Sequence, residues 1–185
     1  MKKLIQKFWI PVMLVLIAAC VVSCLVSLLV PQDPIKLARS ISRVALPKGT
    51  TIVTNNDTGP GLPIPGGASD GYVFLVLQIP MEKIAEFTNT LSNSPDWKPL
   101  PVPAEFAEHE RVLQPSISGG IDESIPITTS TGYYLFIDHQ AEYNKRTGRD
   151  SYAVATPFYE RPSYNFTFCL FNDLDGKLYL WRLDT

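Results

Sequence analysis

The segment NFTFCLFNDLDGKLYLWRL, residues 165–183, decides the fold class of this chain. Two runs rich in aromatic and aliphatic residues, 165–171 and 177–183, flank the polar stretch 172–176. Asp and Gly in that stretch favour a tight turn whose glycine adopts the left-handed conformation. The segment therefore predicts an antiparallel β-hairpin near the C-terminus.

Further strands are predicted outward from this hairpin. The run 72–79 is apolar on both of its alternating faces, which is typical of a central strand covered on both sides. Shorter β-branched or aromatic runs predict strands at 50–54, 133–137 and 151–156, and an edge strand near Ile125. The polar run 140–150 predicts turns, and the Pro- and Gly-rich stretch 55–71 predicts a loop.

Helices are predicted to pack against this sheet. Asp33 and Pro34 are typical of a helix start, and apolar residues then recur at helical spacing as far as Val44. A second apolar stripe at helical spacing follows Pro80 and consists of Met81, Ile84, Phe87 and Leu91. The run 105–113 is compatible with a short helix. Residues 31–185 are therefore predicted to form one α+β domain, with a mainly antiparallel sheet of five or six strands and one or two helices.

Composition excludes several classes of protein. The 185 residues are 45% hydrophobic, which excludes a fully disordered chain, and 16 Pro with 11 Gly exclude an all-helical one. Three Cys are too few for a disulfide scaffold. A net charge of -2 without a basic block argues against nucleic acid as a partner.

The N-terminal segment predicts attachment to a membrane. The 23 residues from Phe8 to Val30 carry no formal charge, and a helix of that length spans about 34 Å, enough to cross a bilayer core. Three lysines precede the run, which favours an N-terminus inside and a domain outside. Residues 1–30 are therefore predicted to be a membrane anchor or signal segment, and 31–185 to be extracytoplasmic. The expected location is a bacterial inner membrane or cell surface, on the periplasmic side in a Gram-negative cell.

A second interpretation of the same segment stays open. Ile17-Ala18-Ala19-Cys20 resembles the lipobox of bacterial lipoproteins, and the resemblance implies cleavage before Cys20 and lipidation of that residue. The residues after Cys20 remain apolar where a lipoprotein usually continues into a polar tether, which favours an uncleaved anchor. Within the anchor, Ala19, Ser23 and Ser27 form a small-residue stripe that can support a homo-oligomer through the membrane helix.

Candidate catalytic groups are sparse. Asp138, His139 and Glu142 are the densest group of potential ligands or acid–base residues, at the end of a predicted strand. Ser69 lies in a G-x-S-x-G pattern, but its loop precedes a strand, whereas a nucleophile elbow needs a strand before the serine and a helix after it. An anchored hydrolase or metal-dependent enzyme using either site is the alternative function. No cofactor is predicted, and Cys169 in its aromatic strand is expected to be a buried thiol.

Aromatic residues crowd the C-terminal half and suggest recognition of a partner. On strands most of them are expected to build core, but exposed Tyr and Trp favour binding surfaces, and the candidates are Tyr159, Tyr164, Tyr179 and Trp181. The predicted function is a non-catalytic binding domain held outside a membrane. Its partner would be a protein or an envelope component, including cell-wall material or an incoming toxin bound by an immunity-type protein.

Overall fold

The computed structural model describes residues 12–13, 15–17, 33–57, 71–115, 124–148, 156–162 and 164–184. The chain divides into two compact units, Met1–Asp33 and Pro34–Thr185, and the second carries the folded core. Within the described residues, no helix has the length and apolar character needed to cross a membrane. Cys20 and most of the predicted anchor at 8–30 lie outside the described residues, and so does Ser69.

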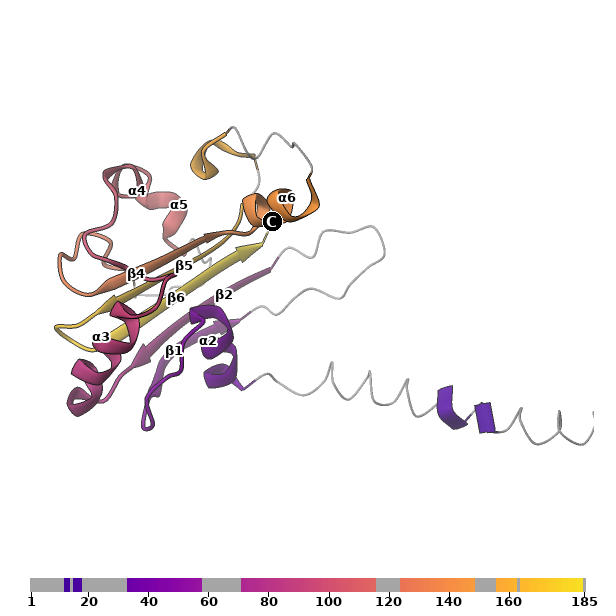
Figure 1. The fold of residues 1–185 in the computed structure, drawn as a ribbon, viewed down its shortest axis with the longest axis horizontal. Helices are drawn as coiled ribbons and strands as arrows, with labels where there is room; N and C mark the ends of the chain where they lie inside the picture. Colours follow the sequence, from indigo (N-terminus) through magenta and orange to yellow (C-terminus); the bar gives the residue numbers. More distant parts are fainter. Residues whose placement is uncertain are drawn as a thin grey trace, which may run out of the picture. The chain divides into compact units, whose positions relative to one another are not determined.

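The second unit is built on a six-stranded antiparallel sheet in the order β1-β2-β6-β5-β4-β3 (Figure 1). The strands are β1 (Thr51–Asp57), β2 (Gly71–Gln78), β3 (Lys98–Pro99), β4 (Tyr133–Asp138), β5 (Asn165–Asn172) and β6 (Lys177–Asp184). The predicted α+β class and antiparallel sheet are therefore confirmed.

The C-terminal hairpin forms as predicted. Strands β5 and β6 pair from Asn172 opposite Lys177 outward, and Gly176 in the turn has φ 70°. The side-chain oxygens of Asn172 and Asp175 accept hydrogen bonds from the backbone N–H groups of Leu174 and Lys177, at 3.1 and 3.0 Å. These local bonds satisfy polar groups within the turn and fix the register of the two strands.

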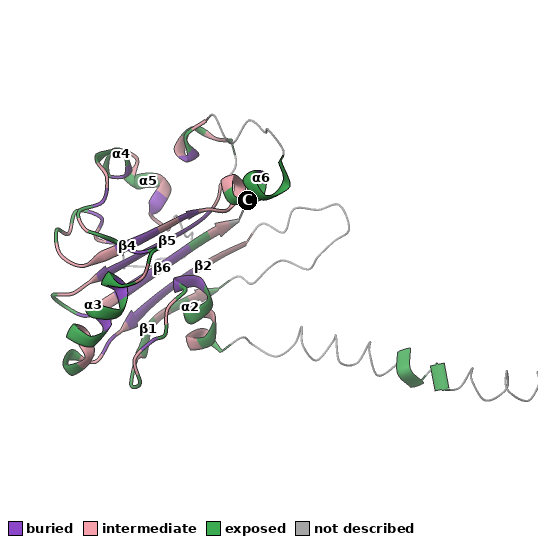
Figure 2. Cartoon of the chain, in the orientation of Figure 1, coloured by how far each residue is buried: buried purple, intermediate pink, exposed green. Residues whose placement is uncertain are grey.

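Apolar side chains alternate along the strands and build one core on each face of the sheet. On one face the core residues of β2, β5 and β6 pack against α2 (Pro34–Ser42) and α3 (Ile84–Ser92). On the other face they pack against α4 (Ala104–Glu108), α5 (Glu110–Leu113) and the 3-10 turn η2 (Phe158–Glu160). Figure 2 shows the buried strands between helices whose outer sides are exposed. Burial on both faces explains the continuous apolar run that predicted a central strand at 72–79.

Three local predictions are wrong. The run 140–150 was expected to form turns, but residues His139–Thr147 form helix α6. Ile125 lies in no strand, although it is 1% exposed, because the side-chain amide of Gln114 pairs with its backbone N–H and C=O at 2.8 and 2.7 Å. Met81 is 66% exposed, since the helix after Pro80 begins with the 3-10 turn η1 (Met81–Lys83), which has no buried residue.

The number of helices also exceeds the one or two expected, because α4, α5 and α6 add to α2 and α3. The predicted strand at 151–156 cannot be compared, because residues 151–155 lie outside the described part of the chain.

Candidate functional site

Helix α6 forms one wall of a cleft of about 990 Å³. The helix contributes His139, Gln140, Glu142, Tyr143, Lys145 and Arg146, while Asn165 of β5 and Arg182 of β6 complete the lining. The cleft therefore combines side chains from segments far apart in the sequence, at the end of the sheet where β5 begins and β6 ends (Figure 1).

Two caps set the length of α6. The Asp138 carboxylate accepts a hydrogen bond from the backbone N–H of Ala141 at 3.0 Å, which satisfies one of the free donors at the start of the helix. Gly148, with φ 65°, ends the helix in the left-handed conformation. Between the caps the sequence is polar, and the helix lies on the surface. Of its cleft-lining residues, His139 and Gln140 are partly buried and the other four are exposed.

A hydrogen bond and an ion pair connect α6 to the rest of the domain. His139 Nε2 lies 2.8 Å from Oγ1 of Thr167, a residue of β5 that is 2% exposed. The Arg43 guanidinium pairs with Glu142 of α6 at 3.4 Å and also with Asp96, outside the helix, at 3.5 Å. Arg43 follows α2 and has φ 57°, a backbone conformation that is uncommon for residues other than glycine.

Of the predicted group of Asp138, His139 and Glu142, the structure keeps His139 and Glu142 close together but pairs Asp138 with Arg161. Arg161 binds Asp138 through two contacts, Nη2 to Oδ2 at 2.7 Å and Nη1 to Oδ1 at 2.9 Å. His139 Nδ1 lies 3.8 Å from Glu142 Oε2, and Glu142 is also paired with Arg43. Among the described residues, no three His, Cys, Asp or Glu side chains come close enough to hold a metal ion. Asp138 thus stabilises the fold as a helix cap and ion-pair partner.

Positive charge dominates among the described lining residues of the cleft. Lys145, Arg146 and Arg182 carry it, and Glu142 is the one carboxylate in this described set. The Arg146 guanidinium lies 5.8 Å from the centroid of the Tyr143 ring, within range of a cation–π contact. In the part of the chain that the structure describes, no ion pair joins any of the three cations to a carboxylate.

The four aromatic residues proposed for partner contact have different environments. Tyr179 and Trp181 are 5% and 3% exposed, because their positions on β6 point into the core under α4 and α5, so this prediction is wrong for both. Tyr159 stacks on His109 with ring centroids 3.9 Å apart, and Tyr164 is partly buried near Phe166.

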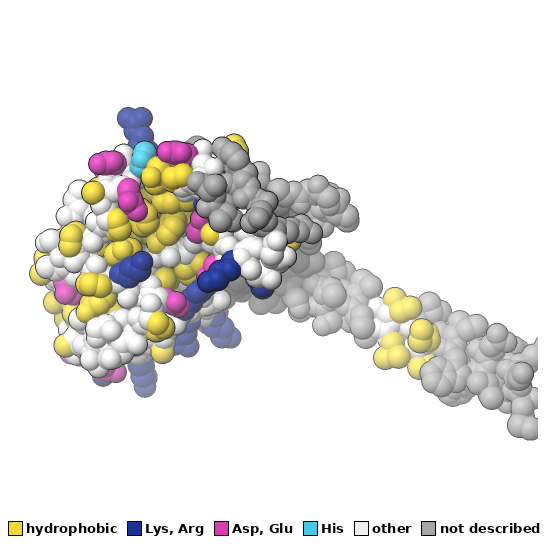
Figure 3. Space-filling view, turned by 45° about the horizontal axis from the view of Figure 1, so that its top comes forward, with side chains coloured by type: hydrophobic (Ala, Val, Ile, Leu, Met, Phe, Trp, Pro, Cys, Tyr) yellow, Lys and Arg dark blue, Asp and Glu magenta, His cyan; other side chains and the backbone are white. Residues whose placement is uncertain are grey.

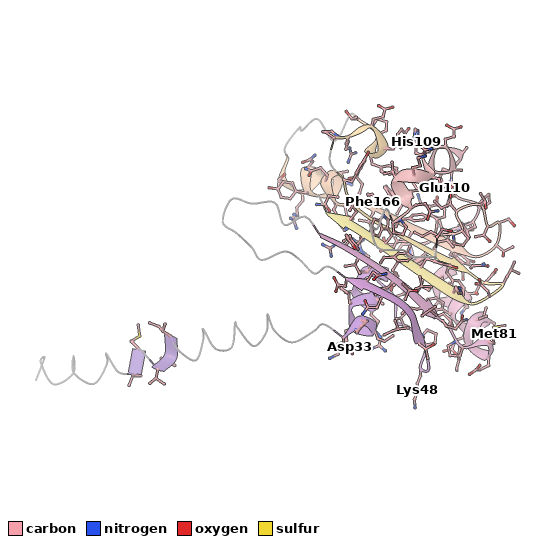
Figure 4. The ribbon with its side chains drawn as sticks, turned by 180° about the vertical axis from the view of Figure 1, so that it is seen from behind. Asp33, Lys48, Met81, His109, Glu110 and Phe166 are labelled. Atoms are coloured by element: carbon pink, nitrogen blue, oxygen red, sulfur yellow. The ribbon has the colours of Figure 1, made fainter. Side chains whose placement is uncertain are left out.

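Some apolar surface remains elsewhere on the domain. Figure 3 shows hydrophobic side chains in a hollow on one face, with acidic side chains and a histidine at its margin. In Figure 4, His109 and Glu110 lie on one side of the molecule, away from Lys48 and Met81.

Cys169 is a buried thiol, as its sequence context predicted. The side chain is fully buried in the core beneath α2 and α3. Burial raises the pKa of the thiol strongly, and the nearby charge of Arg43 offsets only part of this effect. A nucleophilic cysteine needs a lowered pKa and access to solvent, so the environment of Cys169 disfavours that role.

No family model matches the chain, and no curated protein or solved structure is significantly similar to it. The cleft is therefore interpreted from its own residues.

Sequence reasoning found His139 and Glu142 but missed most of the cleft. Asp138 and Gly148 were the available signals for α6, since both residue types are typical of helix ends. Arg182 was a further signal, because it is the single charged residue within the apolar run 178–183. Its position opposite Thr167 in the β5–β6 register is what brings it near His139.

Proposed function

We propose that this chain is a membrane-held, extracytoplasmic binding protein whose binding site is the cleft beside α6. The observation that carries the proposal is the cleft itself, about 990 Å³ in volume, with side chains from α6, β5 and β6 converging on it. Ligand sites are concave and present a small number of convergent polar groups, and the described lining of this open cleft offers such groups. The uncharged run at 8–30 supports the membrane location.

The contacts of the carboxylates in and next to the cleft support binding rather than catalysis. The strongest contacts of Asp138 are to Arg161 and to the start of α6, so its charge serves the fold. Glu142 is shared between Arg43 and His139. A partner protein or an envelope component, including a toxin bound by an immunity-type protein, is the class of ligand expected at such an open site.

Site-specific photo-crosslinking in cells tests this proposal. A photoreactive amino acid replaces Tyr143, which is 41% exposed in the cleft, or Leu174, which is 73% exposed in the β5–β6 turn at the other end of the hairpin. We expect one discrete adduct from position 143 and none from position 174. The same adducts from both positions, or none from position 143, would contradict a binding site in the cleft.

One observation favours the alternative of an anchored hydrolase. Thr167 Oγ1, the His139 ring and the Glu142 carboxylate follow one another at 2.8 and 3.8 Å, the order of a nucleophile, a base and its orienting acid. Thr167 is only 2% exposed and does not line the cleft, so substrate would have to displace α6 to reach it. Hydrolysis of an ester substrate by the full-length chain, lost in His139→Ala, would establish this alternative.

A further inference from the structure

We propose that the ligand of the α6 cleft is an acidic peptide segment, bound through its carboxylates by Lys145, Arg146 and Arg182. This inference rests on the proposed binding function and specifies the chemistry of the partner. It follows from the charge of the cleft, from the origin of its cations and from the size of the site.

The charge of the cleft is opposite to that of its domain. Residues 31–185 contain 13 basic and 18 acidic residues, a net charge of -5. The described lining residues of the cleft reverse this balance, with Lys145, Arg146 and Arg182 against Glu142, whose carboxylate is already paired with Arg43. A positive site on an otherwise acidic domain attracts a negative ligand locally, while the rest of the surface repels it.

The origin of the cations distinguishes a binding site from ordinary helix stabilisation. Lys145 and Arg146 lie in the last turn of α6, where positive charge also favours the helix dipole. Arg182 belongs to β6 and has no role in that helix, yet it lines the same cleft. Arg43 and Arg161, by contrast, are committed to carboxylates of the fold. The three cleft cations have no such ion pair among the described residues.

The size and neutral groups of the cleft favour a peptide over a small anion. The cleft of about 990 Å³ is larger than a single carboxylate or phosphate ion, and its described lining comes from α6, β5 and β6. The side-chain amide of Asn165 offers a donor and an acceptor to a peptide backbone, and the exposed Tyr143 ring offers an apolar contact. The planar guanidinium groups of Arg146 and Arg182 can form bidentate hydrogen bonds with carboxylates.

Binding of a labelled hexaglutamate peptide to the full-length chain in detergent tests the inference, with hexaglutamine, pyrophosphate and anionic phospholipid vesicles as comparison probes. We expect hexaglutamate to bind and hexaglutamine not to bind. Arg182→Gln should weaken hexaglutamate binding roughly tenfold, because it removes one charge-assisted contact. Lys48→Gln, the same charge change at an exposed site outside the cleft, should leave binding unchanged.

Equal losses in Arg182→Gln and Lys48→Gln would overturn the inference, because the attraction would then depend on net charge alone. Pyrophosphate or the vesicles binding in an Arg182-dependent way, without hexaglutamate binding, would also overturn it, since the site would then recognise phosphate. Failure of hexaglutamate while the crosslink at position 143 persists would reject the acidic peptide and retain the binding function. Absence of any crosslink from position 143 would reject the binding function itself.

Discussion

At the scale of single residues, Asp138 shows how a side chain with catalytic chemistry can serve the fold. It caps α6 and binds Arg161, and the two side chains are 18% and 10% exposed. Such a partly buried pair depends on both members, because removing one leaves the other charge without compensation.

We therefore expect Asp138→Ala to lower the free energy of unfolding by about 2 kcal/mol, from loss of the helix cap and of the partner of Arg161. Asp138→Asn keeps an oxygen acceptor for the cap and should cost about half as much. Urea unfolding of the full-length chain in detergent, followed by tryptophan fluorescence, measures both. Equal stability of Asp138→Ala and the wild type would show that the cap and the ion pair contribute nothing.

Cys169 makes stability depend on alkaline pH. Burial raises the pKa of its thiol in the folded chain, whereas the unfolded thiol ionises near pH 8.5, about its ordinary value. The folded state therefore keeps a proton that the unfolded state loses, and stability falls as pH rises above about 8.5, by at most about 1.4 kcal/mol per pH unit.

The measurement is urea unfolding between pH 7 and about 9.5, where most ordinary tyrosines, with a pKa of about 10, are still protonated. Burial also raises the pKa of Tyr134, so higher pH would mix two effects of the same sign. Cys169→Ala should show a shallower decline than the wild type over this range. Parallel declines in the two proteins would assign the effect to other groups.

At the scale of elements, glycines fix two of the connections. Gly132 precedes β4 with φ 111°, and a Cβ there would lie 2.0 Å from the carbonyl oxygen of Phe171. Gly148 ends α6 with φ 65°, but a Cβ there would meet nothing within 4 Å. Both glycines have a positive φ, but only Gly148 has room for a Cβ atom.

Gly132→Ala should therefore destabilise the domain by about 3 kcal/mol or more, because β4 must move away from β5. Gly148→Ala should cost only about 1 kcal/mol, the penalty of a left-handed alanine. The urea midpoints of the two variants compare them directly. A cost for Gly148→Ala equal to that for Gly132→Ala would mean that conformational strain, rather than contact with Phe171, limits both sites.

Helix α6 and the segment at Ile125 show why sequence patterns failed at this scale. A helix with one buried residue, Asn144, has no apolar stripe, so its polar composition predicted turns. Ile125 is buried and β-branched, but a Gln114 side chain occupies the place of a neighbouring strand. The Asp138 cap in α6 and the Gln114 amide at Ile125 supply hydrogen-bond partners to backbone groups. The pattern of apolar residues does not report either contribution.

At the scale of the whole molecule, membrane topology is the prediction that the proposed function depends on most. Leu174 is 73% exposed, so a cysteine there is accessible, whereas the native Cys169 is buried. In intact cells we expect a membrane-impermeant maleimide to label Leu174→Cys. Lys3→Cys, on the opposite side of the predicted anchor, should be labelled only after permeabilisation. Labelling of Leu174→Cys only after permeabilisation would place the domain inside the cell and contradict the extracytoplasmic proposal.

Much of the fold is readable from the chain because a strand or a helix is encoded by neighbouring residues. The continuous apolar run 72–79 and the turn at 172–176 specified β2 and the β5–β6 hairpin, and the stripe ending at Leu91 specified α3. Side-chain periodicity follows local backbone geometry, so these elements need no knowledge of their partners.

The cleft is different, because its side chains meet only after long-range packing. Arg182 reaches the cations of α6 through the pairing of β5 with β6, and Arg43 reaches Glu142 across 99 residues. The same packing buries Tyr179 and Trp181 and places Asp138 in an ion pair with Arg161. The packing of elements far apart in the chain decides which side chains meet. The spacing of residues along the sequence does not specify it, because that spacing reports only local backbone geometry.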